Sequence, residues 1–531
     1  MLNVILSQFF IKDIKMRCFL RFTLIFISVF SLSVAKDTLN FAVSKNVGPL
    51  NPHLYSPNEM FAQNMVYEGL VDYSESGVIP KLALSWEISK DGTSYIFHLR
   101  KDAVFSNGEK FNASAVKSNF DAIMDNKKRH SWLELTNIIK SYEVKDEYTF
   151  VLNIDHPYEP TLRELALVRP FRFIAPTAMI NGGTKDGIKE AIGTGAYILK
   201  ESKLGVYDKF VANKKHYEFN PKYDEILAKV IPDPNTKVIA LKTGEVDLIY
   251  GNGQITLDSF NELKKDYPTI ISKPMLTTTL ALNSSKFPTS DLSVRKALNM
   301  ILDKDMINEK LFYKTQKKAD FLFNPNLEGA NLYVKPYEFN INKANEILEN
   351  DGWILKGDIR YKDNKPLNLE LVYIGSDTAQ KGIAEILQAN AKKIGANVEL
   401  IAQESTIFYK RQKNGTFNLI FNNTWGAPYD PVAFLASMRA PSHADFMAQS
   451  GLENKALIDK KITEILSTLD VDKRNSLIKE VLTILHNEAI YIPITYMTDQ
   501  VVYRKNVDGI SSDIVKYNIK FWEFYPVKNK R

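Results

Sequence analysis

The segment Leu367–Ile401 reads LNLELVYIGSDTAQKGIAEILQANAKKIGANVELI. Its first part, Leu367–Tyr373, alternates apolar and polar side chains as a strand does, and Asn397–Ile401 alternates again. Between them, Lys381–Ile394 repeats apolar residues at the spacing of one helix face. Phe417–Asn423 predicts a further strand. Strands separated by a helix of this length predict a βαβ unit, so we expect an α/β fold with a partly parallel sheet.

Two extended segments flank this unit in the chain. Leu280–Asn283 predicts a strand that crosses from a first lobe to a second, and Tyr491–Tyr496 predicts a crossing back. Helices are expected over Ala456–Leu469 and Val471–Ala489. Two α/β lobes joined by two extended interlobe crossings predict a clamp around a ligand cleft. The predicted division is 36–279 for the main part of lobe I, 280–494 for lobe II, and 495–531 for the return to lobe I.

The first 35 residues have the pattern of a secretory signal peptide. Arg17 and Arg21 precede the apolar run Phe22–Leu32, and the small residues Ser33 and Ala35 stand before Lys36. The run is about eleven residues long, too short for a transmembrane helix. We therefore expect cleavage near Ala35, translation from Met1 or Met16, and a periplasmic location for the mature protein.

Charge and cysteine content limit the functions that are possible for the mature chain. Of the formal charge of +6, the signal segment carries +3, from four basic residues and one acidic residue, which leaves about +3 for the rest. This balance, without a basic stripe, argues against a nucleic-acid partner. The single cysteine, Cys18, lies in the signal segment. After cleavage there is no cysteine for a disulfide, for catalysis or for a metal.

The stretch Thr424–His443, TWGAPYDPVAFLASMRAPSH, is the candidate binding loop. Its prolines at 428, 431 and 441 prevent one continuous helix or a central strand, so we expect a shaped loop with a short helical piece near Ala433–Met438. A loop with aromatic residues that ends in an imidazole suits the wall of a ligand cleft. A buried structural corner would have the same sequence.

The histidines limit what kind of metal site is possible. None of the seven is paired at i+3 or i+4, and neither HxH nor HExxH occurs. A divalent transition-metal ion needs several donor atoms in a defined geometry. A cage made by the protein alone is poorly supported, and a chain with no metal site would look the same. One imidazole could instead complete the coordination of a metal that arrives chelated, if guanidinium groups held the carboxylates of the chelator.

Several motifs resemble those of the extracytoplasmic solute-binding proteins of the peptide/nickel ABC-importer family. These motifs are Pro80–Trp86, Asp91-Gly92, Tyr95–Arg100 and Val294–Leu298. Longer runs resemble the nickel-binding members of that family: Asn46–Tyr55, Arg129–Leu135, Arg169–Pro176, Thr424–Pro431 and Pro441–Phe446. The resemblance implies a periplasmic-binding-protein-like clamp of the large peptide/nickel-binding subclass, monomeric and not an enzyme, that delivers a nickel chelate to inner-membrane ABC permease subunits.

The resemblance also implies a set of site residues. His443 would bind Ni²⁺, and Arg129 and Arg169 would hold the carboxylates of a small chelator such as free histidine. The remaining pocket residues it implies are Tyr55, Met60, Trp132, Trp425 and Tyr429. Departures from the family pattern are Ala196 in place of a common proline and Ser106-Asn107-Gly108 in place of His-Asp-Gly.

Other functions stay open at this point. A di- or oligopeptide binder or a haem binder of the same family would share the fold. Peptide binders resembling this chain carry an aspartate for the peptide amino terminus where this chain has Ala427, so a buried ammonium would lack its partner. A secreted hydrolase is disfavoured because GxSxG and HExxH are missing. A chaperone-like surface protein is a further alternative.

Overall fold

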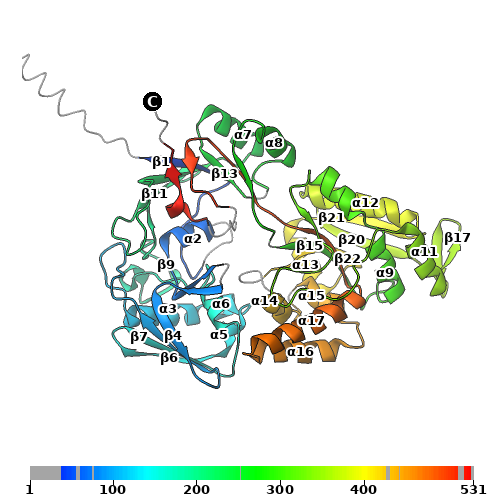
Figure 1. Ribbon diagram of the computed structural model, residues 1–531, viewed down its shortest axis with the longest axis horizontal. Helices are drawn as coiled ribbons and strands as arrows, with labels where there is room; N and C mark the ends of the chain where they lie inside the picture. Colours follow the sequence, from blue (N-terminus) through cyan, green and yellow to red (C-terminus); the bar gives the residue numbers. More distant parts are fainter. Residues whose placement is uncertain are drawn as a thin grey trace, which may run out of the picture.

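The computed structural model describes residues 37–54, 60–74, 77–251, 253–274, 276–425, 431–441, 443–511 and 519–527. They form two lobes, each built around one large sheet with helices packed on it (Figure 1). The two-lobed α/β clamp predicted from the sequence is confirmed. None of the helices in these residues combines the length and the apolar content needed to cross a bilayer.

The first lobe contains a seven-stranded sheet and a smaller antiparallel one. In the large sheet β1 (Thr38–Val43) lies parallel to β12 and β13, which places the first strand of the mature chain at the centre. The strands of the large sheet are, in order, β10 (Tyr197–Lys203), β11 (Tyr207–Ala212), β12 (Glu225–Val230), β1, β13 (Leu248–Tyr250), β24 (Gln500–Tyr503) and β14 (Thr269–Ile271). Those of the smaller sheet are β4 (Ala83–Ile88), β5 (Ser94–Leu99), β7 (Thr149–Ile154) and β6 (Ile139–Asp146).

The second lobe contains a six-stranded sheet that includes the predicted βαβ unit. Strands β20 (Asn368–Ile374) and β21 (Asn397–Gln403) pair in parallel, and α12 (Thr378–Lys392) connects them. The Asp377 side chain caps α12, and the buried face of the helix is the predicted apolar one. The order of the sheet is β16 (Lys317–Lys318), β23 (Tyr491–Tyr496), β15 (Thr277–Leu282), β22 (Leu419–Asn423), β20 and β21.

The two connections between the lobes differ from the predicted ones. Leu280–Asn283 and Tyr491–Tyr496 are not crossings, because β15 and β23 pair with each other inside the second sheet. The crossings are the short connections from β14 to β15 and from β23 to β24. They run side by side: the Ser272 N–H donates to the Asp499 carbonyl at 2.9 Å, and the Met497 N–H donates to Leu276 at 2.6 Å. The lobe boundaries given for the sequence stay a prediction.

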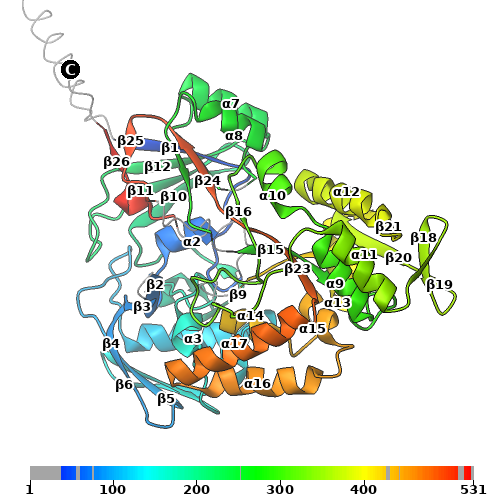
Figure 2. The ribbon, with the colours of Figure 1, turned by 45° about the vertical axis from the view of Figure 1, so that its right-hand side comes forward.

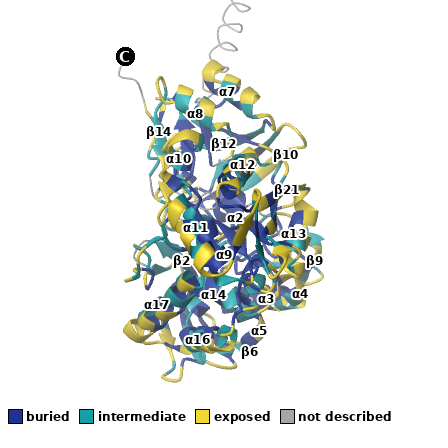
Figure 3. Cartoon of the chain, turned by 90° about the vertical axis from the view of Figure 1, so that its right-hand side faces the viewer, coloured by how far each residue is buried: buried dark blue, intermediate teal, exposed yellow. Residues whose placement is uncertain are grey.

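The C-terminal helices α16 (Lys455–Ser467) and α17 (Val471–Asn487) confirm the two helices predicted there. They pack against each other below the second sheet and reach toward the first lobe, where α5 (Glu134–Ile138) and α6 (Thr161–Leu165) lie (Figures 1 and 2). Apart from Arg474, their buried residues are apolar, and their outer faces are exposed, a division that Figure 3 shows across the molecule. The backbone of Glu159, before α6, donates to the carbonyl of Leu466 in α16 at 2.8 Å, so the lobes also touch here.

Gly193, Thr194 and Gly195 form a tight bend in the first lobe. A Cβ at Gly193 would lie 2.0 Å from the carbonyl oxygen of Val66, and one at Gly195 would lie 2.3 Å from that of Met65. The turn therefore packs directly on the end of α2 (Met60–Val66). The Thr194 hydroxyl donates to Glu68 at 2.8 Å, which fixes the turn to the residues that follow the helix.

Candidate functional site

The first-lobe part of the candidate site combines a guanidinium group with an indole. Helix α4 (Lys127–His130) ends two residues before Trp132, whose side chain is partly exposed. The guanidinium carbon of Arg169 lies 4.9 Å from the centre of the Trp132 ring. Stacking on an indole restricts the orientation of a guanidinium.

Arg129 and Arg169 lie in one neighbourhood, although forty residues separate them in the chain. His130 is fully buried, and its pKa is lowered to about 4, first by burial and then by the charges of Arg129 and Arg169. Both guanidinium groups must lie near this imidazole to act on it. The structure thus brings Trp132 and Arg169 together, and the buried His130 imidazole lies within electrostatic reach of both Arg129 and Arg169.

The second-lobe part is an indole and an imidazole in contact. Trp425 follows the end of β22, and His443 immediately precedes α15 (Ala444–Gln449). Their ring centroids lie 5.2 Å apart with an interplanar angle of 44°. The predicted helical piece is confirmed as α14 (Pro431–Ser437), whose Phe434 contacts Trp425 edge-on at 6.2 Å. The candidate loop is therefore partly a structural corner, with both rings half-buried.

The electrostatic state of His443 suits a metal ligand. Burial lowers the pKa of its imidazole below the ordinary value of 6.5. A neutral imidazole has a lone pair for coordination, whereas a protonated one does not. Among the described residues, no group of three or more His, Cys, Asp or Glu side chains is arranged to hold a metal ion. His443 would therefore act as a single donor.

A buried polar cluster supports this second part, and sequence reasoning missed it. The carboxylate of Asp445, in the first turn of α15, is fully buried. Its Oδ1 accepts from the Asn422 amide at 2.7 Å and from the Tyr491 hydroxyl at 2.8 Å. Burial raises the pKa of Asp445 to about 7. The sequence contained one signal of this cluster. Asp445 stands between the apolar residues Ala444 and Phe446, a position that favours a side chain directed into the interior.

The binding roles of all the predicted site residues stay predictions, and three of the pocket residues have no described contact with either part of the site. Tyr55 and Tyr429 lie outside the described residues. Met60 is the first residue of α2 and is 7% exposed. A side chain buried to this extent packs mainly against the interior, so a part for Met60 in the pocket stays a prediction.

The two site parts belong to lobes that approach each other. Arg439 follows α14 in the second lobe, and its guanidinium donates to the Thr463 hydroxyl of α16 at 3.2 Å. The Leu466 carbonyl of the same helix accepts from the Glu159 N–H of the first lobe at 2.8 Å. Tyr158 is fully buried, and its hydroxyl donates to Glu164 at 2.7 Å. The loop that contains Trp425 and His443 is thus anchored close to the place where the lobes touch.

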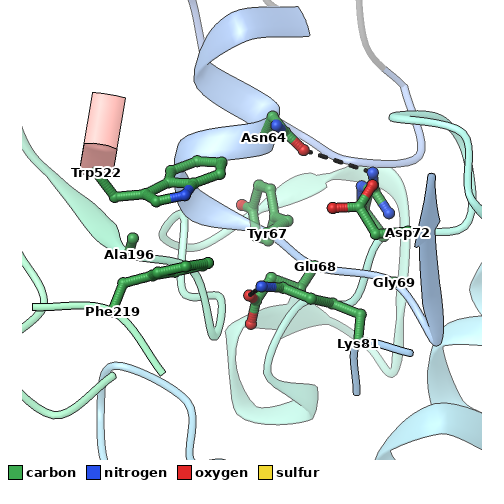
Figure 4. A pocket seen from close by; sticks show the side chains of 10 residues that line it. Asn64, Tyr67, Glu68, Gly69, Asp72, Lys81, Ala196, Phe219 and Trp522 are labelled. Carbon is green, nitrogen blue, oxygen red and sulfur yellow. Dashed lines mark hydrogen bonds and ion pairs between the residues drawn. The ribbon is translucent and has the colours of Figure 1, made fainter. Parts of the chain in front are cut away.

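A separate cavity lies inside the first lobe and contains none of these residues (Figure 4). Its volume is about 10 Å³, room for about one water molecule. Two of the charged groups in its wall, Lys81 and Glu68, form an ion pair at 3.2 Å. Trp522 stacks on Phe219 on one side, with ring centroids 5.2 Å apart. This cavity is too small for a chelate. Its wall consists of Asn64, Tyr67, Glu68, Gly69, Asp72, Lys81, Arg172, Ala196, Phe219 and Trp522.

Comparison with known proteins gives consistent matches over almost the whole chain. The family described as "Bacterial extracellular solute-binding proteins, family 5 Middle" matches residues 77–446. The "Nickel-binding periplasmic protein" of Escherichia coli (strain K12) is 48% identical over 502 residues, which cover 93% of this chain and 96% of that protein.

Two solved structures are similar in both fold and sequence. A crystal structure of NikA from Brucella suis in complex with Fe(III)-EDTA has a TM-score of 0.89 and 50% identity, and the match covers 92% of this chain and 100% of that one. A crystal structure of NikZ from Campylobacter jejuni in complex with Ni(L-His) has a TM-score of 0.76 and 26% identity, with 93% and 100% covered.

Proposed function

Because the chain belongs to the family 5 bacterial extracellular solute-binding proteins, we propose that it captures a nickel chelate and delivers it to an ABC importer. The relative from Escherichia coli is named for nickel binding and for the periplasm, and it matches this chain at nearly full length. The observation that carries the proposal is the contact between Trp425 and a neutral, half-buried His443. It provides one nitrogen donor beside a flat apolar wall.

The metal would arrive with most of its coordination filled. His443 supplies one donor, and Ni²⁺ takes roughly four to six. A small chelator that carries carboxylates would supply the others and would bring negative charge. The chelators bound in the two similar structures, EDTA and L-histidine, both carry carboxylates, which supports this proposal.

Arg129 and Arg169 would hold the carboxylates of the chelator. A guanidinium can bind a carboxylate through two parallel hydrogen bonds, and the stacking of Arg169 on Trp132 restricts its orientation. Trp132 and Trp425 would cover the apolar parts of the chelate from the two lobes. Tyr55, Met60 and Tyr429 complete the proposed pocket. Free histidine, with an imidazole, an amine and a carboxylate, fits this set of partners.

Capture and release would follow from hinge motion at the paired crossings. The open clamp admits the chelate, and closure brings the His443 side onto the Arg129 and Arg169 side. The closed protein would then present both lobes to the inner-membrane permease. We further propose that the protein is a monomer in the periplasm after cleavage near Ala35, and that it is not an enzyme.

Calorimetric titration of the mature protein with Ni²⁺ tests the proposal, in the absence and presence of L-histidine. We expect tight binding only with the chelator, and a loss of about 100-fold or more in His443→Ala, because the only proposed protein donor is gone. His98→Ala, which removes an imidazole from the exposed surface, should bind like the parent. Equal affinity in His443→Ala would contradict the metal-ligand role. Binding of a peptide or of haem without nickel would favour the alternative ligands of the family.

A further inference from the structure

We propose that Asp445 is a positioning residue for nickel binding, since its buried carboxylate fixes the imidazole of His443 against the indole of Trp425. The inference rests on the proposed function and deepens it. Asp445 is fully buried, so it would not touch the chelate itself. It would act through the two residues whose rings lie 5.2 Å apart.

The carboxylate joins three separate elements. Asp445 belongs to α15, Asn422 to β22 and Tyr491 to β23. One oxygen, Oδ1, accepts both hydrogen bonds, at 2.7 Å from the Asn422 amide and 2.8 Å from the Tyr491 hydroxyl. All three side chains are buried, where hydrogen bonds are poorly replaced by water. The start of α15 is therefore tied to the central strands of the second sheet.

The same cluster holds both members of the ring pair. His443 is two residues before Asp445, at the start of α15, so fixing the first turn of the helix fixes the backbone of His443. Trp425 is three residues beyond Asn422, just past the end of β22. One carboxylate thus connects the backbone that carries the imidazole with the backbone that carries the indole. A metal bond tolerates only small errors in donor position, which makes this connection matter for affinity.

The chemistry of the cluster argues against a role in packing alone. Among the described residues, Oδ2 of Asp445 has no hydrogen-bond partner although it is buried. A buried carboxylate with one unpartnered oxygen costs stability relative to an apolar side chain of similar size. If the Asp445 side chain only filled space, an apolar side chain in its place would increase the stability of the protein. We therefore infer that the carboxylate of Asp445 serves to fix the geometry of the neighbouring His443.

A double-mutant cycle tests the inference, with the dissociation constant for Ni²⁺ and L-histidine and the visible absorption spectrum of bound nickel as readouts. Asp445→Ala should weaken binding about 10- to 100-fold, as loss of an outer partner of a metal ligand does. Asp445→Asn keeps an acceptor oxygen for both donors and should restore binding. In the His443→Ala background, Asp445→Ala should add no further loss, because the imidazole it positions is missing.

Two further variants keep the test decisive. Tyr491→Phe removes one donor only and should weaken binding about two- to tenfold, again with no added loss in His443→Ala, even where Asp445→Ala fails to fold. Asn299→Ala removes a buried side chain of the second lobe that bonds the Arg295 and Ala489 carbonyls, and it should lower stability without changing nickel affinity.

The outcomes separate the two proposals. If His443→Ala weakens binding but neither Asp445→Ala nor Tyr491→Phe does, the positioning role is wrong and the metal-ligand role stands. Equal losses in the parent and His443→Ala backgrounds would also overturn the positioning role. If His443→Ala binds nickel like the parent, the metal-ligand role is wrong and the positioning role falls with it.

Discussion

The carboxylate of Glu159 in the first lobe lies 3.3 Å from the guanidinium of Arg474 in the second. The Arg474 side chain is 4% exposed and that of Glu159 is 15% exposed, so solvent screens this ion pair little. The Glu159 N–H also donates to the Leu466 carbonyl at 2.8 Å. Within the described residues the lobes are therefore joined at the paired crossings, at this contact and where the Tyr313 hydroxyl donates to Asp258 of α8 (Leu257–Leu263). We expect the contact at Glu159 to break when the clamp opens.

Glu159→Gln should shift the protein toward the open form. The substitution keeps the size of the side chain and its backbone hydrogen bond but removes the charge that faces Arg474. We expect a larger radius of gyration by small-angle X-ray scattering and about three- to tenfold weaker binding of the nickel chelate, within the range for a hydrogen bond to a charged group. Glu464→Gln, which breaks the exposed pair with Lys473 inside the second lobe, is the matched control and should change neither. An unchanged scattering profile in Glu159→Gln would argue against a latch.

Arg169 should discriminate chelators by their carboxylate. Arg169→Gln should weaken binding of nickel with L-histidine about tenfold or more, because a charged fork is lost from the carboxylate. Histamine has the same imidazole and amine but no carboxylate, so the loss for nickel with histamine should be small. Competition titrations with the two chelators measure this difference. Lys128→Gln, a change of the same charge beside Arg129, should leave both affinities as they are, and equal losses for the two chelators would refute the assignment.

The stability of the first lobe should fall in mild acid because of His53. Its ring nitrogens lie 3.0 Å from the Thr184 hydroxyl and 3.0 Å from the Arg172 carbonyl, and burial lowers its pKa to about 3. In the unfolded chain the imidazole takes up a proton below about pH 6.5. The unfolded state therefore binds more protons than the folded one between about pH 6.5 and 3, and stability decreases as the pH falls through this window.

The expected slope from one such group is about 1.4 kcal/mol per pH unit at most. Urea unfolding of the parent and of His53→Gln at several pH values between 4 and 7 measures it. The variant should be less stable at pH 7 but should depend less on pH. His98→Gln, on the exposed surface, should keep the slope of the parent. The prediction fails if His53→Gln and the parent have parallel pH profiles.

Gly193→Ala should strongly destabilise the first lobe. The added Cβ would lie 2.0 Å from a backbone carbonyl of α2, so the turn and the helix would have to separate. Overpacking of this kind costs about 1–3 kcal/mol or more. Gly183→Ala, where the nearest atom would lie 3.9 Å away, is the control and should be close to neutral. Denaturant midpoints of both variants test this, and similar midpoints would show that the contact relaxes easily.

Patterns within single segments of the sequence predicted those parts of the fold that depend on one segment alone. The alternation in β20 and β21 and the apolar face of α12 were sufficient for the βαβ unit, and the family motifs for the two lobes. The crossings were misplaced because a strand paired on both sides, like β15, is as apolar as an extended connection. Only the pairing with β22 and β23 separates the two cases, and pairing is not visible in one strand.

In the candidate site, too, single residues could be proposed from the sequence, but contacts between distant segments could not. Trp425 and His443 were proposed as site residues because both lie in one short stretch of sequence, and Arg129 and Arg169 because the resemblance implies them. The nearness of those two arginines to His130 depends on how α4 meets a distant segment, which periodicity does not report. The Asp445 cluster and the contact of Glu159 with Arg474 join elements far apart in the chain, so neither was predicted.

The pairing of the two crossings restricts the direction in which the protein can move. Ser272 and Asp499 bond through backbone and side chain, so the connections form a narrow ribbon and not two independent tethers. Such a ribbon flexes readily out of its plane and resists sliding of one strand past the other. Each opening and closing should then follow nearly the same path. The His443 imidazole of the second lobe would therefore return to the same position over the bound chelate in every cycle.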